Sequence, residues 1–111
     1  MVDKTATDLC SPCSTDWDKV ITLKDYIDYN IAYDYDLANR IENKTVTAYL
    51  PHAATTLLTG KGICYDMASL FAAMCRSQGI PCIIQKGYVN NVYHAWNEVL
   101  IDGIWYSIDV K

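Results

Sequence analysis

Apolar side chains recur in the second half of the chain with the spacing of an α-helix that is buried along one side. This stripe comprises positions 64, 67, 68, 71, 72 and 75. Gly79 suits the left-handed position that follows a helix, and Pro81 prevents its continuation. An earlier stripe over residues 15–31 has Asp and Lys between its apolar positions. It predicts a surface helix with Ser14 or Thr15 as the N-cap.

The last third of the chain predicts an antiparallel meander of three strands. Residues 82–89 and 92–101 have the composition of strands and flank Asn90-Asn91. Asp102-Gly103 is a two-residue hairpin signal that leads into a third strand over residues 104–110. Because these strands follow one another directly, we expect an antiparallel sheet.

Two polar segments complete the layout. Residues 1–13 predict a polar leader. Residues 32–36 alternate Tyr and Asp, and residues 43–52 mix Thr, Lys and Pro, so we expect a turn-rich connection that wraps over the core. The whole chain, residues 1–111, is predicted to form a single α+β domain in which the central helix packs against the sheet.

Composition and charge narrow the class of protein. The chain has 111 residues, of which 51% are hydrophobic and 20% are charged. It is therefore long enough for one hydrophobic core and too short for two ordinary domains. The net charge of −4 gives no excess of basic residues that could bind a phosphate backbone, so we exclude nucleic acid as a partner. No window approaches the roughly 18 consecutive apolar residues of a membrane span, and the first residues lack the pattern of a secretion signal. The chain stops directly after a predicted strand, so we expect a segment truncated after residue 109.

The cysteines and aspartates raise the question of a metal. Five cysteines are an odd number, so at least one thiol is free. Cys10 and Cys13 have the spacing of a redox pair or of half a zinc site, but the second half is missing, which favours a surface or disulfide role. Asp34 and Asp36 hint at a calcium loop that lacks its Gly and its terminal Glu. We predict neither a metal nor a cofactor.

Cys64 begins the buried helix and follows Gly60 and Gly62. At the first turn of a helix, unpaired backbone N–H groups and the positive end of the dipole favour the nucleophilic thiolate. The same N–H groups can hold the oxyanion of an acyl-transfer intermediate, and the glycines leave room for a substrate backbone. Taken alone, however, a cysteine at such a position is more often a packing residue than a nucleophile.

His94 and Asp109 change that balance. With Asp102-Gly103 as the hairpin loop, Trp96 faces Asp109 on the neighbouring strand. His94 and Trp96 lie on one face of their strand, so Asp109 is a diagonal neighbour of His94 at roughly 5.5 to 8 Å between backbones. A carboxylate there would orient the imidazole and stabilise its charged form. A thiol, an imidazole and a carboxylate in this order predict covalent acyl transfer.

Several motifs in this part of the chain carry a resemblance to a known family. They read TLLTGKGICYDMA over residues 56–68, RSQGIP over 76–81, YHAWNEV over 93–99 and WYSID over 105–109, with a weaker match, YIDYNIAYDYDL, over 26–37. The chain resembles the transglutaminase-like superfamily, which has the papain-like fold of cysteine proteases. This resemblance implies an α+β, cysteine-protease-like fold with the nucleophile helix on an antiparallel sheet. It further implies that Cys64 is the nucleophile, His94 the general base and acid, and Asp109 the orienting carboxylate.

The resemblance leaves the second oxyanion donor open. Papain-like enzymes often place a Gln before the nucleophile, but both Gln residues here follow Cys64. The backbone N–H of Cys64 remains one donor, and Tyr49 is our candidate for the other. Trp96 and Trp105 are candidates to shield an acyl-enzyme from water or to line a substrate channel, with packing in the core as the alternative.

The implied activity is thiol-dependent acyl transfer from, or hydrolysis of, a protein or peptide carboxamide through a thioester. An amine acceptor gives transglutaminase crosslinking, and water gives a peptidase, amidase or deamidase. The first alternative is a catalytically silent module that binds a protein or peptide with the same fold. The second is a redox or metal protein that uses Cys10 and Cys13. The resemblance suggests a bacterial cell-surface or secreted setting, and the sequence leaves the oligomeric state open.

Overall fold

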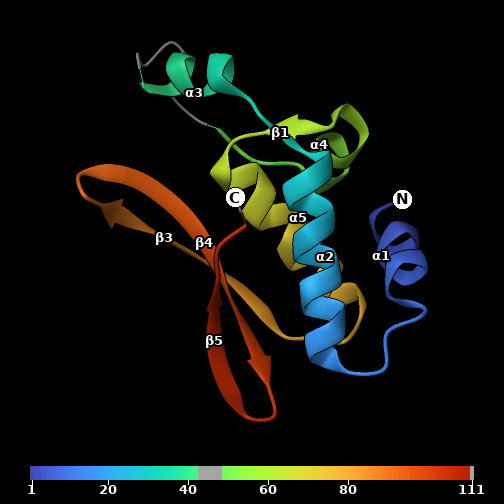
Figure 1. Cartoon of the computed structure of the whole chain (residues 1–111). Coiled ribbons are helices and arrows are strands. Elements are labelled where there is room, and N and C mark those ends of the chain that lie inside the picture. Colours follow the sequence, from blue (N-terminus) through green and yellow to red (C-terminus); the bar gives the residue numbers. More distant parts are fainter. Residues whose placement is uncertain (43–48, 111) are drawn as a thin grey trace.

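The computed structural model describes residues 1–42 and 49–110 and has helices on one side of a small antiparallel sheet (Figure 1). This is the predicted α+β class, and the expected packing of a central helix on an antiparallel sheet is confirmed. The described elements are α1 (Val2–Cys10), α2 (Asp16–Asn30), β1 (Ala32–Tyr33), α3 (Tyr35–Glu42), α4 (Ala53–Thr59), β2 (Lys61–Gly62), α5 (Cys64–Ser77), β3 (Cys82–Val89), β4 (Val92–Ile101) and β5 (Ile104–Ile108).

Helix α5 is the centre of the core, as its apolar stripe predicts. Met67, Phe71 and Met74 are fully buried, and complete burial of such a side chain contributes about 1.5–3 kcal/mol. The helix ends at Ser77, and Gly79 just beyond it has the expected left-handed conformation, with φ of 77°. Two hydrogen bonds close this end: the Gly79 amide donates to the Arg76 carbonyl, and the Ile80 amide donates to the carbonyl of Cys75.

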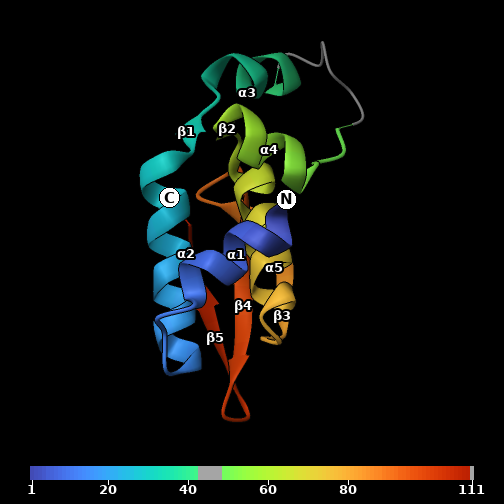
Figure 2. The same cartoon turned by 90° about the vertical axis from the view of Figure 1, so that its right-hand side faces the viewer.

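Helix α2 lies beside α5, and α1 crosses both of them on the side away from the sheet (Figure 2). The predicted surface helix is confirmed as α2, which is capped by the Thr15 hydroxyl accepting from the Asp18 amide at 3.1 Å. The leader, in contrast, forms helix α1, whose Ala6 and Cys10 lie in the core. Nine residues with so few apolar positions carry no clear helical signal, and packing against α5 stabilises the helix.

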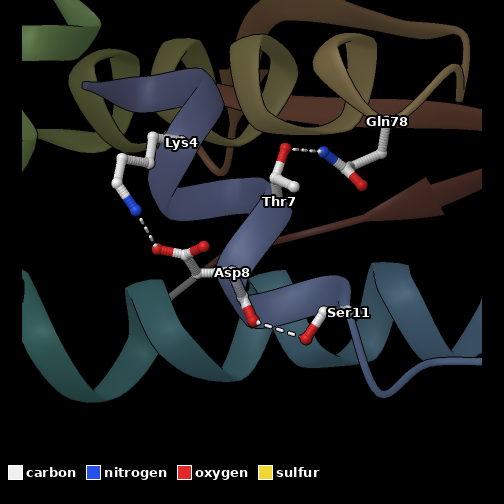
Figure 3. A network of polar contacts seen from close by, with 5 residues as sticks. All are labelled: Lys4, Thr7, Asp8, Ser11 and Gln78. Atoms are coloured by element: carbon white, nitrogen blue, oxygen red, sulfur yellow. Dashed lines mark hydrogen bonds and ion pairs between the residues drawn. The ribbon is translucent and has the colours of Figure 1, made fainter.

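Polar contacts fasten α1 at its surface (Figure 3). Gln78, at the end of α5, donates its side-chain amide to the Thr7 hydroxyl at 3.1 Å. Within α1, Lys4 and Asp8 form an exposed ion pair at 2.8 Å, which contributes little to stability. The contact between Gln78 and Thr7 therefore adds to the packing that holds α1 on α5.

The sheet has the order β3-β4-β5 and the predicted register. Ile101 pairs with Ile104 and Asn97 with Ile108, so the hairpin loop is Asp102-Gly103, with φ of 53° and 80°. Asn90-Asn91 likewise joins β3 to β4 with two positive φ angles, the geometry of tight hairpins. Strand β5 ends at Ile108, two residues earlier than predicted.

The connection between α2 and α5 is more regular than the turn-rich segment that the sequence predicts. Strands β1 and β2 form a short parallel pair, and α3 begins after Asp34, whose carboxylate accepts from the Leu37 amide at 3.0 Å. The predicted turns at residues 43–48 lie outside the described residues. No helix within the described part of the chain is long and apolar enough to cross a bilayer.

Candidate active site

Cys64 is the first residue of α5, and its half-buried thiol borders a cavity. Ile63 caps the helix in extended conformation, and the first helical hydrogen bond runs from the Met67 amide to the Ile63 carbonyl at 3.0 Å. Among the described residues, the Cys64 amide donates to no partner. This N–H group is therefore free to bind an anion beside the thiol.

The cavity beside Cys64 has a volume of about 360 Å³ and lies between α3 and the tip of the β3–β4 hairpin. Its walls are mainly aromatic and aliphatic, which is typical of sites that bind organic ligands. The lining residues are Tyr33, Ala38, Ile41, Glu42, Ile63, Cys64, Tyr88, Asn91 and Tyr93. Burial, with a contribution from the nearby Cys64, raises the pKa of Tyr33, so its hydroxyl stays protonated at neutral pH.

His94 and Asp109 are in direct contact. The imidazole Nε2 lies 3.1 Å from each carboxylate oxygen of Asp109, and the side chains of His94 and Asp109 are 26% and 60% exposed. A carboxylate at Nε2 favours the tautomer in which Nε2 carries the hydrogen, which leaves Nδ1 as an acceptor. The ring also stacks on Trp96, with centroids 5.9 Å apart.

The three candidate residues are thus positioned in two parts. His94 and Asp109 form one unit, and Cys64 lies on the cavity wall with Tyr93, the residue before His94. Within the described part of the chain, the Cys64 thiol and the His94 ring share no hydrogen bond. In unliganded sites such contacts are often long and shorten when a substrate binds.

Tyr49, the sequence candidate for an oxyanion donor, contacts Asp66. Its hydroxyl donates to Asp66 Oδ1 at 2.5 Å, while Asp66 Oδ2 accepts from the Ile63 amide at 2.9 Å. Burial and the bond to Asp66 raise the pKa of Tyr49, so it remains a donor. Tyr49 and Asp66 line a second cavity, of about 320 Å³, and not the one that Cys64 borders. Its role as an oxyanion donor stays a prediction.

Sequence reasoning missed Asn97, which is fully buried between β4 and α5. Its side-chain amide donates to the Ala68 carbonyl at 2.9 Å and so links the strand of His94 to the helix of Cys64. A buried strand position normally carries an apolar side chain, and a lone Asn there is the signal that could have drawn attention to it.

The remaining cysteines and acids have other roles. All five cysteines are free thiols, and Cys13 contacts the Thr22 hydroxyl at 3.4 Å. Asp36 pairs with Arg40 at 3.1 Å. Across residues 1–42 and 49–110, no group of three or more His, Cys, Asp or Glu side chains is arranged to hold a metal ion. Trp105, named with Trp96 as a candidate for a substrate channel, is 46% exposed.

Comparison with known proteins agrees with this architecture. The family model of the transglutaminase-like superfamily matches residues 3–110. Human kyphoscoliosis peptidase is 30% identical over 97% of this chain, which spans 17% of that protein's length. A proposed cysteine protease from Cytophaga hutchinsonii superposes with a TM-score of 0.81 at 26% identity, over 98% of this chain and 36% of its own. The periplasmic domain of TgpA from Pseudomonas aeruginosa, bound to ethylmercury, superposes with a TM-score of 0.73 at 20% identity, over 97% and 42%.

The fold defines a cysteine-protease-like α+β protein. The match over nearly the whole chain makes the assignment more specific: this chain belongs to the transglutaminase-like superfamily.

Proposed function

We propose that this protein performs thiol-dependent acyl transfer or hydrolysis on a protein or peptide carboxamide, with Cys64, His94 and Asp109 as the reacting group. The observation that carries the proposal is the contact of His94 Nε2 with both oxygens of Asp109 at 3.1 Å. This contact holds the imidazole in one orientation and favours the tautomer that leaves Nδ1 free to accept a proton. Cys64, at the start of α5, is the kind of nucleophile that such a base serves.

In the proposed reaction, Nδ1 of His94 takes the proton of the Cys64 thiol, and the sulfur attacks the carbonyl carbon of the amide. The C–N bond breaks, Nδ1 returns the proton to the departing amine or ammonia, and a thioester remains. The free Cys64 amide supports this scheme because it can donate to the oxyanion of the tetrahedral intermediate. Attack by an amine or by water on the thioester regenerates the thiol.

The cavity beside Cys64 supports a peptide substrate. Tyr33, Tyr88 and Tyr93 offer aromatic surface to a side chain that flanks the reacting amide, and Asn91 offers a polar group. Trp96 stacks on the imidazole, which supports its role as a shield between the acyl-enzyme and water. Trp105 remains a candidate for a substrate channel.

One observation favours a second candidate, a silent module that binds a protein or peptide in the same cavity. The thiol and the imidazole make no hydrogen bond to each other among the described residues. If they also stay apart when a peptide is bound, the cavity binds without turnover. The cell-surface or secreted setting and the single-domain organisation over residues 1–111 stay predictions.

The test is a screen of glutamine peptides with and without a primary amine, in which ammonia release and product mass are followed. We expect turnover that Cys64→Ala abolishes and that Cys13→Ser, which removes the other partly exposed thiol, leaves unchanged. Incorporation of the amine identifies a transferase, and release without incorporation identifies a hydrolase. Full activity in Cys64→Ala contradicts the proposal, and peptide binding without turnover supports the silent module.

A further inference from the structure

Asp66 is a buried carboxylate in the same helical turn as Cys64. It is 1% exposed, and both of its oxygens are bound by neutral donors, the Ile63 amide at 2.9 Å and the Tyr49 hydroxyl at 2.5 Å. Burial of a carboxylate is unfavourable unless hydrogen bonds compensate it. These two donors therefore fix the position of the Asp66 carboxylate at the start of α5.

Gly62 shows how closely this carboxylate is packed. A Cβ atom added at Gly62 would lie 2.6 Å from the Cβ of Asp66 and 3.1 Å from its Oδ2. Non-bonded carbon atoms do not approach to this distance without displacement of the backbone. The strand that leads to Cys64 thus fits around Asp66, and the side chain has no room on that side.

The amides of the first turn explain why this placement matters. A carboxylate in the first turn of a helix can accept from several of the N–H groups that lack helical partners. Here Asp66 accepts from the Ile63 amide, which leaves the Cys64 amide without a partner among the described residues. If the Tyr49 hydroxyl were absent, Asp66 Oδ1 would lose its donor and compete for the next free amide, that of Cys64.

We propose that Tyr49 and Asp66 are positioning residues: Tyr49 holds the Asp66 carboxylate on the Ile63 amide and thereby reserves the Cys64 amide for the oxyanion of the acyl-transfer intermediate. This inference rests on the proposed function. It gives Tyr49 an indirect role in place of the direct donation predicted from the sequence, because the single hydroxyl hydrogen of Tyr49 is donated to Asp66.

The experiment compares two reactions of Cys64, only one of which forms an oxyanion. Turnover of a glutamine peptide passes through a tetrahedral intermediate, whereas alkylation by iodoacetamide displaces iodide at a saturated carbon. For Tyr49→Phe we expect kcat to fall about 10- to 100-fold with KM within about twofold. Alkylation of Cys64, followed by peptide mass mapping, should stay within about twofold of wild type.

Two further variants make the comparison decisive. Asp66→Asn keeps the shape and an acceptor for the Ile63 amide, so it should retain more turnover than Asp66→Ala. Tyr29→Phe removes a hydroxyl from a side chain that is 86% exposed, and it should match wild type in both reactions.

Each outcome decides the inference. A fall in kcat with unchanged alkylation supports it. An equal fall in both reactions indicates general damage to the helix start and overturns it, as does unchanged turnover in Tyr49→Phe. Turnover that does not depend on Cys64 would overturn the proposed function itself. That result comes from Cys64→Ala and is therefore distinguishable from a failure of the inference, which is tested by Tyr49→Phe.

Discussion

The side-chain amide of Asn97 in β4 donates to the backbone carbonyl of Ala68 in α5 over 2.9 Å. Through this buried contact the strand that carries His94 is tied to the helix that carries Cys64, close to the point where the proposed reaction takes place. Asn97, which is not itself a candidate reacting residue, therefore ties together the two elements that carry the proposed base and the proposed nucleophile.

We predict that Asn97→Ala lowers the free energy of unfolding by about 1–3 kcal/mol, because a buried hydrogen bond is lost. Urea denaturation followed by circular dichroism measures the change. The matched control is Asn30→Ala, which removes an exposed side-chain bond to the Tyr26 carbonyl and should shift stability by less than about 0.5 kcal/mol. Equal effects of the two substitutions would show that the Asn97 contact is not a structural tie.

Asp109→Ala should reduce kcat about a hundredfold, because the imidazole loses the group that fixes its tautomer and orientation. Asp109→Asn should retain more activity than the alanine variant, since its carbonyl oxygen can still accept from Nε2–H. Steady-state kinetics with a glutamine peptide measure both. Ser107→Ala, an exposed position on β5, is the control. If the alanine variant turns over within twofold of wild type, Asp109 has no orienting role.

Stability should fall at alkaline pH. A hydrogen bond to Cys82 and burial raise the pKa of Cys75, and burial and Asp66 raise the pKa of Tyr49. Groups with a raised pKa in the folded state bind protons more tightly there than in the unfolded chain, so stability is lost as the pH rises above the unfolded pKa values. These lie at about 8.5 for Cys and about 10 for Tyr.

Urea titrations between pH 7 and pH 11 test this dependence. We expect a decline that begins near pH 8.5 and steepens near pH 10. Cys75→Val removes the first part of the decline, and Tyr49→Phe removes part of the second. Stability that rises over this range would mean that folding does not raise the pKa values of these two groups.

Tyr88→Ala should weaken peptide binding at the cavity beside Cys64. Tyr88 lies against Tyr93, with ring centroids 5.6 Å apart, and both side chains line the cavity. We expect KM to rise about three- to tenfold while kcat changes little. This is the result when the lost contact bound the substrate and the transition state equally well. Tyr29→Ala, on α2 and outside the cavity, should leave KM unchanged. A fall in kcat with KM unchanged would rule out this binding role.

Elements with strong periodicity could be predicted from the sequence. The apolar stripe gives α5, Asp102-Gly103 fixes the hairpin register, and that register brings Asp109 to His94. In each case the pattern repeats over several turns or is set by a turn type that few residues satisfy.

The missed features depend on tertiary contacts. Helix α1 is too short for its pattern to be informative and is stabilised by packing on α5. The bond between Tyr49 and Asp66 joins residues 17 positions apart across a segment without periodicity. The cap at Ile63 is equally hidden, because an Ile at the N-cap gives none of the usual capping signals.

The most direct test of the central claim is the rate at which iodoacetamide labels Cys64 across a pH series, in wild type and in His94→Ala. If the imidazole activates the thiol, wild-type Cys64 is labelled rapidly below about pH 7. His94→Ala then shifts rapid labelling to the range of an ordinary thiol, about pH 8.5. Identical profiles in the two proteins, both with ordinary thiol reactivity, would contradict the assignment of Cys64 and His94 as nucleophile and base.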